Sequence, residues 1–300
     1  MGEKLEIRFL GTGSAIPTAK KNHVGTLISH ASNNILVDCG EGIQRQFRIA
    51  KLNPCKLTHI LISHWHADHT LGIPGLLETL HMSEYQKTLH IYGPKETKRN
   101  ITLFEKIYGR FKIKYEVHEV SKGKVIDGKD FCIEALPMNH TKPTNAYSLT
   151  IKDRLRLRKN VLKKLKLPNS PMLAKLQEGK NITYKGKKIK AKSVTYLEKG
   201  KKITIVMDTA PNDNAIKLAK NSDILISEAS FIEEQKDKAI KYKHLTVKQA
   251  ATIAKKAKVK KLILTHNSQR YEKSTKLIIQ EAKKIFKNTI LANDFDKITV

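Results

Sequence analysis

The stretch Ser63-His64-Trp65-His66-Ala67-Asp68-His69 directly follows the apolar run Ile60-Leu61-Ile62. It holds three histidines and one aspartate within six residues. Residues two apart in an extended segment point to the same side, so His64 and His66 can bind one ion together. The aspartate and the third histidine follow where the chain turns into the next helix, within reach of a second ion. These residue types at this spacing are typical of a catalytic metal site.

Two coordination shells need more ligands than this cluster supplies. Three further polar residues directly follow apolar runs that are typical of buried strands. They are His140 after Ile133–Met138, Asp208 after Ile203–Met207 and His266 after Leu262–Thr265. Each alone could be an ordinary structural residue, but together with the cluster they become candidate ligands.

The chemistry of this ligand set indicates the kind of substrate. Five neutral imidazoles and two carboxylates would bring two negative charges to two dications, and a bridging hydroxide would leave a small positive charge. Such a pair suits an anionic phosphodiester, because two metals roughly 3.5–4 Å apart stabilise the attacking and leaving oxygens and lower the pKa of a bound water towards about 7. Imidazole-rich shells favour zinc over magnesium, while iron and manganese remain open.

The charge balance indicates a polyanionic partner. The chain has 57 Lys and Arg against 28 Asp and Glu, a formal net charge of +29. Charge of this size repels itself in the folded state, and binding to nucleic acid or an anionic membrane would explain it. A lysine-rich composition from an AT-rich genome is the alternative. No apolar run approaches the ~18 residues of a membrane span, and the N-terminus lacks the apolar core of a signal peptide. The three cysteines form no disulfide framework, which predicts a cytoplasmic protein.

The pattern of elements predicts an α/β fold. Short β-type runs fall in two blocks, over 5–151 and 202–293, and the clearest helical patterns are Thr246–Lys258 and Ser274–Phe286. We therefore expect two sheets packed face to face with helices outside, an αββα sandwich, as a single domain over 1–300.

One segment, at about 152–202, differs in composition from the rest. It has 18 Lys or Arg against three acids, and Leu167-Pro168-Asn169-Ser170-Pro171 interrupts regular structure within it. We expect an inserted basic arm, although an ordinary solvated surface helix and hairpin would have the same composition. Its candidate RNA-binding residues are Arg154, Arg156, Arg158, Lys159, Lys163 and Lys164.

The metal-binding pattern His-x-His-x-Asp-His after a strand resembles the metallo-β-lactamase superfamily, and further motifs resemble the ribonuclease Z family within it. These motifs run over nearly the whole chain, from about Leu5 to Leu291. They are Phe9-Leu10-Gly11-Thr12-Gly13-Ser14 with Pro17 and Asn22, Leu36-Val37-Asp38-Cys39-Gly40-Glu41-Gly42-Ile43-Gln44, Asp208-Thr209, and Leu264-Thr265-His266-Asn267-Ser268-Gln269-Arg270-Tyr271.

The resemblance implies a role for each site residue. His64, His66 and His140 would hold one zinc, while Asp68, His69 and His266 would hold the other and Asp208 would bridge. Asp68 would also accept a proton from the attacking water. His244, oriented by Glu228, would donate a proton to the departing 3′ oxygen. The alternative for His244 is a structural place beside the start of the helix that follows Thr246.

The resulting hypothesis is a zinc-dependent endoribonuclease of the ribonuclease Z type, with two Zn²⁺ per chain. It would remove the 3′ trailer from precursor tRNA and leave a 3′-hydroxyl on the tRNA. The resemblance also implies a homodimer. The alternatives are another hydrolase of this fold acting on a small ester or thioester, which would need neither the charge nor the arm, and a non-catalytic RNA-binding module, which would not need the ligands. Six histidines match no motif and have no assigned role: His23, His30, His59, His81, His90 and His118.

Overall fold

The computed structural model describes residues 5–300, which form two compact units. The first unit comprises the described chain up to Asp127 together with Ile133–Leu149 and Lys202–Val300. The second unit comprises Gly128–Cys132 and Thr150–Lys201. The segment 152–202, expected as an inserted basic arm, therefore makes up most of the second unit.

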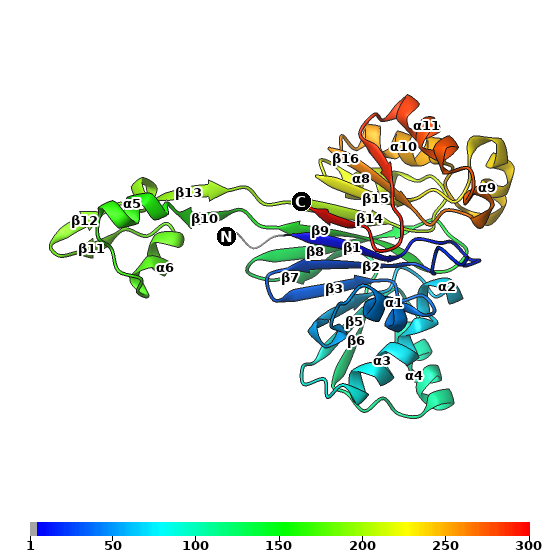
Figure 1. The fold of residues 1–300 in the computed structure, drawn as a ribbon, viewed down its shortest axis with the longest axis horizontal. Coiled ribbons are helices and arrows are strands. Elements are labelled where there is room, and N and C mark those ends of the chain that lie inside the picture. The colour runs from blue at the N-terminus through cyan, green and yellow to red at the C-terminus, as the bar shows by residue number, and fades with distance from the viewer. Residues whose placement is uncertain (1–4) are drawn as a thin grey trace. The chain divides into compact units, whose positions relative to one another are not determined.

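The first unit is built on two seven-stranded sheets that face each other (Figure 1). The strand order of the first sheet is β18 (Lys297–Thr299), β1 (Glu6–Gly11), β2 (Gly25–His30), β3 (Asn33–Val37), β4 (His59–Leu61), β5 (Leu89–Gly93) and β6 (Tyr115–Glu119). The order of the second is β17 (Thr289–Leu291), β16 (Lys261–Thr265), β15 (Ile224–Glu228), β14 (Lys202–Val206), β9 (Thr144–Ile151), β8 (Phe131–Met138) and β7 (Gly123–Asp127).

Helices cover the outer face of each sheet. The first sheet carries α1 (Ile43–Ile49), α3 (Gly72–Met82) and α4 (Thr97–Tyr108), and the second carries α8 (Asp213–Ala219), α10 (Val247–Lys256) and α11 (Thr275–Ile285) (Figure 1). Short α2 (Ala67–Thr70) follows β4, and α9 (Lys236–Tyr242) precedes α10. Two apolar cores lie between the sheets and their helices. The predicted αββα sandwich is confirmed.

The two predicted blocks of strands do not correspond to the two sheets. Strands β7, β8 and β9 precede the basic segment but belong to the second sheet, while β18 at the C-terminal side joins the first sheet beside β1. The sequence patterns also missed β7 and β18. Both have mostly exposed side chains at the edge of a sheet, so they lack the alternation of buried and exposed residues that marks an internal strand.

One side-chain and one backbone hydrogen bond link the two sheets close to the predicted metal-binding segment. The hydroxyl of Tyr147, a fully buried residue of β9, donates to the carbonyl of Ile62 at 2.7 Å. The backbone N–H of Asn145 donates to the carbonyl of Ser63 at 2.9 Å. The segment that begins at His64 is therefore held from both sheets. Within residues 5–300, no helix is long and apolar enough to cross a membrane.

The second unit has secondary structure and a small core of its own. Its elements are β10 (Arg154–Leu157), α5 (Lys159–Lys164), α6 (Met172–Gln177), β11 (Ile182–Tyr184), β12 (Lys187–Ile189), α7 (Ala191–Val194) and β13 (Thr195–Glu198). Strands β10 and β13 pair with each other, as do β11 and β12. Leu173, Leu176 and Val194 are among the buried residues of the core. The basic segment is therefore more than a solvated surface helix and hairpin.

Candidate metal centre

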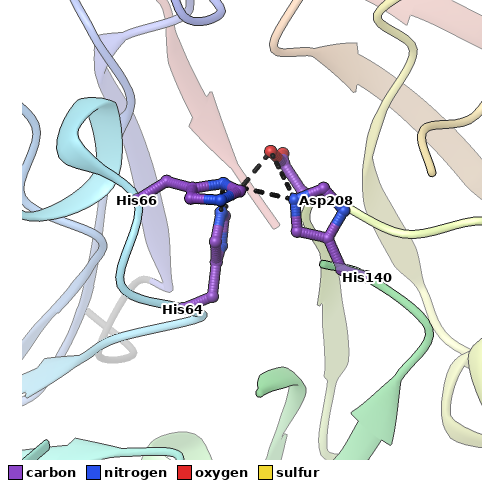
Figure 2. Close-up of side chains that lie close together, drawn as sticks. All are labelled: His64, His66, His140 and Asp208. Carbon is purple, nitrogen blue, oxygen red and sulfur yellow. Dashed lines mark hydrogen bonds and ion pairs between the residues drawn. The ribbon is translucent and has the colours of Figure 1, made fainter. Parts of the chain in front are cut away.

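The predicted ligands follow strand ends of both sheets. The first cluster occupies the loop after β4 and the start of α2, while the other ligands follow strands of the second sheet. Their side chains face one another, as Figure 2 shows for four of them. These are His64, His66, His140 and Asp208.

The first group surrounds one oxygen of Asp208. Its Oδ2 lies 3.6 Å from Nε2 of His64 and 3.8 Å from Nε2 of His140. Nδ1 of His66 lies 2.8 Å from Nε2 of His64 and 3.3 Å from Nε2 of His140 (Figure 2). Three imidazole nitrogens and a carboxylate oxygen that converge in this way form the donor set of a transition-metal site.

The second group consists of Asp68, His69 and His266, whose ligand atoms also converge. Oδ2 of Asp68 lies 3.4 Å from Nε2 of His69 and 3.3 Å from Nε2 of His266. Asp208 connects this group with the first, because its Oδ2 is also 3.5 Å from Nε2 of His69. The geometry therefore has two neighbouring ligand groups with one aspartate between them.

Two buried polar atoms indicate that a metal fits here. Nε2 of His69 and Oδ1 of Asp208 are shielded from solvent and have no hydrogen-bond partner within residues 5–300. A buried polar atom without a partner costs about 1–3 kcal/mol, more when the group is charged. Coordination to a cation would satisfy both atoms.

Hydrogen bonds outside the ligand groups orient the imidazoles. Oδ2 of Asp38 accepts from Nδ1 of His69 at 2.8 Å, and the other oxygen of Asp38 accepts from the backbone N–H of Ser63 at 2.7 Å. Nδ1 of His140 donates to the carbonyl of Lys243 at 2.9 Å. In both His69 and His140, Nδ1 is occupied and Nε2 is directed to the centre, an arrangement that metal-binding histidines use.

Burial and the neighbouring charges shift the pKa values in the centre. Burial lowers the pKa of His64 well below its usual range. Burial, together with the nearby His140, lowers the pKa of His66 to about 4. Burial alone would raise the pKa of Asp68, but the adjacent His69 and His266 lower it far below its usual range. These residues therefore present neutral nitrogens and an ionised carboxylate, the forms that bind metals.

Glu228 and His244 lie beside the centre. Nδ1 of His244 is 3.1 Å from Oε1 of Glu228 and 3.9 Å from Oδ2 of Asp208. Glu228 is fully buried, and its carboxylate also accepts from the backbone N–H of Thr209 at 2.9 Å and the hydroxyl of Ser230 at 2.7 Å. The structure thus places the predicted Glu–His pair together, next to the aspartate between the ligand groups.

His244 does lie beside a helix start, as the alternative interpretation expected, and this position is compatible with its contact to Glu228. Thr246 is the N-cap of α10 and forms a capping box with Gln249. His244 precedes this cap by two residues, but its ring points to Glu228. The cap fixes the start of the helix without using the imidazole, so the ring stays available for chemistry.

Sequence patterns gave no role to two residues that orient the site. Asp38 directly follows β3, so the criterion that selected Asp208, a polar residue after a buried strand, would have found it. Ser230 carries no such signal: its hydroxyl lies 2.9 Å from Nδ1 of His266 as well as binding Glu228. Its contacts to Glu228 and His266 depend on the folded path of the loop after β15.

The predicted RNA-binding residues all belong to the second unit, whereas the ligand groups belong to the first. Arg154 and Arg156 both bind Glu198, at 2.6 and 2.8 Å. The guanidinium of Arg158 lies over the ring of Tyr196, 5.7 Å from its centroid. Three exposed lysines, Lys159, Lys163 and Lys164, extend along α5.

Comparisons with known proteins agree with this fold and site. The family model described as Anti-Pycsar protein Apyc1 matches residues 5–167. Ribonuclease Z of Archaeoglobus fulgidus is 38% identical over 98% of this chain and 97% of the relative, and that of Nanoarchaeum equitans is 37% identical over 97% and 92%. The crystal structure of human tRNase Z, short form, has a TM-score of 0.70 and 26% identity, covering 98% of both chains. The metallo-β-lactamase fold protein YhfI from Bacillus subtilis has a TM-score of 0.72 and 20% identity, covering 99% and 100%.

Two facing sheets with His/Asp ligands at their strand ends define a hydrolase of the metallo-β-lactamase fold. Within this class the chain belongs to the ribonuclease Z family, and its residues 5–167 also fall within the family that the Apyc1 model describes. The resemblance and the prediction of an enzyme of the ribonuclease Z type are confirmed. The expectation of a metal-binding centre agrees with the two ligand groups.

Proposed function

We propose that this chain is a zinc-dependent endoribonuclease that removes the 3′ trailer from precursor tRNA and leaves a 3′-hydroxyl on the tRNA. The observation that carries the proposal is the pair of ligand groups that share Asp208, with the Glu228–His244 pair beside them. The relatives named ribonuclease Z and the human tRNase Z supply the substrate class.

Two zinc ions per chain fit these groups. The first would be held by His64, His66 and His140, and the second by Asp68, His69 and His266, with Asp208 between them. Zinc bound there would supply a Lewis acid for the phosphate oxygens and lower the pKa of a bound water towards about 7. The predominance of imidazole in both groups supports zinc over magnesium.

Asp68 is suited to accept the proton of the attacking water. Its Oδ2 is placed between Nε2 of His69 and Nε2 of His266, so the carboxylate has a fixed orientation in the centre. Its lowered pKa keeps it ionised at neutral pH. A carboxylate within reach of the water can take its proton as the phosphorus–oxygen bond forms.

His244 is suited to protonate the leaving 3′ oxygen of the tRNA. The buried carboxylate of Glu228 holds Nδ1, which leaves Nε2 as the donor. As the bond between phosphorus and the 3′ oxygen breaks, the proton on Nε2 passes to that oxygen and gives the 3′-hydroxyl. The phosphate stays on the trailer.

The basic second unit would bind the body of the tRNA. The scissile phosphate is the same in every RNA, so recognition needs contacts elsewhere, and most such contacts are made to phosphates. We propose that Arg154, Arg156, Arg158, Lys159, Lys163 and Lys164 make them. Because Arg154 and Arg156 share Glu198, the lysines of α5 carry the larger part of the available charge.

The proposal extends to the partners and the compartment of the protein. We propose a cytoplasmic homodimer that acts on precursor tRNA and needs no membrane. Helix α4 exposes Leu103, Ile107 and Tyr108, an apolar face that a second copy could cover. Light scattering of the wild type and of an Ile107→Glu variant would test the dimer at this face.

The function is tested with the full-length protein and a defined precursor tRNA. We expect one cut at the 3′ side, with a 3′-hydroxyl on the tRNA fragment and a phosphate on the trailer. Replacing the ligands of both groups should lower the zinc count from elemental analysis by two ions per chain, and a chelator should abolish cleavage until zinc is restored. Cleavage that persists in metal-free protein would refute the mechanism. Hydrolysis of a small ester without any RNA cleavage would favour the small-substrate alternative.

A further inference from the structure

A second cluster of potential metal ligands lies in the first sheet, separate from the centre described above. It consists of His90 on β5 with Glu116 and His118 on β6, and their ligand atoms lie within 4.8 Å of one another. The proposed reaction uses none of them. Both histidines belong to the set that matches no sequence motif.

The register of two strands creates the cluster. Strands β5 and β6 are parallel, and their pairing sets His90 opposite Glu116. His118 lies two residues further along β6, so it shares a face of the sheet with Glu116. Strand β6 is at the edge of the sheet, and the three side chains are 34%, 57% and 36% exposed. An ion could therefore reach them from solvent.

The atoms are spaced as metal ligands are. Oε2 of Glu116 is 3.3 Å from Nδ1 of His90 and 3.5 Å from Nε2 of His118. In a tetrahedral site with bonds of about 2.0–2.2 Å, neighbouring ligand atoms are roughly 3.3–3.6 Å apart. The ring of Tyr92 stacks on that of His118, with centroids 4.5 Å apart and planes inclined by 18°. One ligand ring is thus already held in place.

One nitrogen of the cluster lacks a hydrogen-bond partner among the described residues. Nε2 of His118 is shielded from solvent and makes no hydrogen bond within residues 5–300, although it faces the carboxylate of Glu116. A hydrogen bond between Nε2 of His118 and the carboxylate of Glu116 would be shorter and better aligned than the contact in the structure. A cation between the two groups accounts for the arrangement, because both atoms would then act as electron-pair donors.

The cluster is distinct from the catalytic centre. On β4, the residues in register with it are His59 and Leu61. The catalytic cluster starts at His64, three to five residues further along the chain. At a rise of about 3.3 Å per residue, an extended chain would span up to roughly 10–16 Å here, and the cluster shares no residue with the catalytic ligand groups.

We propose that His90, Glu116 and His118 bind one additional divalent transition-metal ion, which links edge strand β6 to β5. Two imidazoles and a carboxylate select ions of the zinc class over magnesium and calcium. Three protein ligands leave one position for water. An exposed ion pair without metal would add little to stability, whereas a bound ion would join the two strands through all three side chains.

The test counts ions in the whole protein. The metal-free chain is dialysed against buffered micromolar zinc, and bound zinc per chain is measured by elemental analysis. We expect the wild type to retain one ion more than Glu116→Gln and one more than the double variant His90→Gln with His118→Gln. Glu116→Gln replaces an exposed side chain by one of equal size, so folding is preserved. The control His81→Gln removes a half-buried imidazole from α3 and should bind as much zinc as the wild type.

Two further readouts locate the ion. Hydrolysis of bis(p-nitrophenyl) phosphate should be the same in all four proteins, because that substrate needs only the catalytic centre. Hydrogen exchange of the β6 amides should slow with zinc in the wild type and not in Glu116→Gln. Equal zinc in all four proteins would overturn the proposal. So would loss of an ion together with phosphodiester hydrolysis, since that ion would have left the catalytic centre. The zinc count stays informative even if precursor tRNA proves not to be the substrate.

Discussion

Nδ1 of His244 lies 3.1 Å from one carboxylate oxygen of Glu228 and 3.2 Å from the other, and Glu228 is fully buried. Burial lowers the pKa of His244, but the negative charges of Glu228 and Asp208 outweigh burial and raise it to about 9. His244 is therefore protonated at neutral pH, the form that a proton donor needs. Its charge is lost as the pH rises through about 9.

Replacing Glu228 by Gln should move this loss to lower pH. The substitution removes the charge that holds the proton, so the pKa of His244 falls towards the ordinary value and the alkaline decline of activity begins earlier. The pH dependence of kcat/KM on precursor tRNA measures the shift. Bis(p-nitrophenyl) phosphate is the control, because its good leaving group needs no proton and its alkaline limb should not move. Equal shifts on both substrates would argue against proton donation.

Asp68→Asn should reduce kcat far more than RNA affinity. The carboxylate acts on the attacking water, whereas the body of the tRNA is bound elsewhere, so the loss belongs to the chemical step. We expect a decrease of about 10²–10⁴-fold, the usual contribution of a general base. Single-turnover rates and equilibrium binding of precursor tRNA separate the two effects. Zinc content is measured alongside, and a matching loss of affinity and rate would indicate a structural role instead.

Ser230→Ala should slow the chemical step without weakening RNA binding. The hydroxyl donates to Glu228 at 2.7 Å and lies 2.9 Å from Nδ1 of His266, so it positions both partners. A hydrogen bond to a charged group contributes about 1.5–3 kcal/mol, which corresponds to roughly a 10- to 100-fold decrease in kcat. Ser230→Thr keeps the hydroxyl and should restore most of the rate. If both variants lose rate equally, packing at this position is what matters.

Replacing Lys159, Lys163 and Lys164 by Ala should weaken binding of precursor tRNA and flatten its salt dependence. Each lost phosphate contact reduces the slope of log affinity against log salt by about 0.7–0.9. Hydrolysis of bis(p-nitrophenyl) phosphate should be unchanged. The matched control replaces three exposed lysines at and just after the end of α10, with the same loss of charge: Lys255, Lys256 and Lys258.

Deleting residues 154–198 extends that test to the whole basic segment. The segment has its own small core, so its removal should leave the ligand groups of the first unit intact. Affinity for precursor tRNA should fall while hydrolysis of the small phosphodiester persists. Loss of both activities in a folded, zinc-loaded protein would make the segment part of the catalytic core. If affinity for precursor tRNA is unchanged, the basic residues of the segment only form a solvated surface and do not bind the RNA.

The residues predicted as ligands lie close together in the structure, and several of them were found because they follow a buried strand. Asp208 and His266 follow parallel strands of the second sheet, which bring them to one edge, and His64 follows β4 of the first sheet. The sheet to which β7, β8 and β9 belong was not predictable in the same way. Strand pairing depends on long-range contacts, such as those between β9 and β14, that leave no local pattern.

Short-range patterns also missed the residues that orient the ligands. Ser230 acts through its hydroxyl and Lys243 through its backbone carbonyl. Every serine has such a hydroxyl and every residue has such a carbonyl, so the sequence does not distinguish these two positions. The cluster of His90, Glu116 and His118 depends on the register of two strands separated by a helix. Neither composition nor spacing within one segment encodes that register.

The two ligand groups draw on residues from His64 to His266, more than two hundred positions apart in the chain. During synthesis, the strands of both sheets must therefore leave the ribosome before the two ligand groups can assemble. Contacts of such sequence separation form late and slowly. A nascent chain would therefore lack a complete second ligand group until His266 has been synthesised.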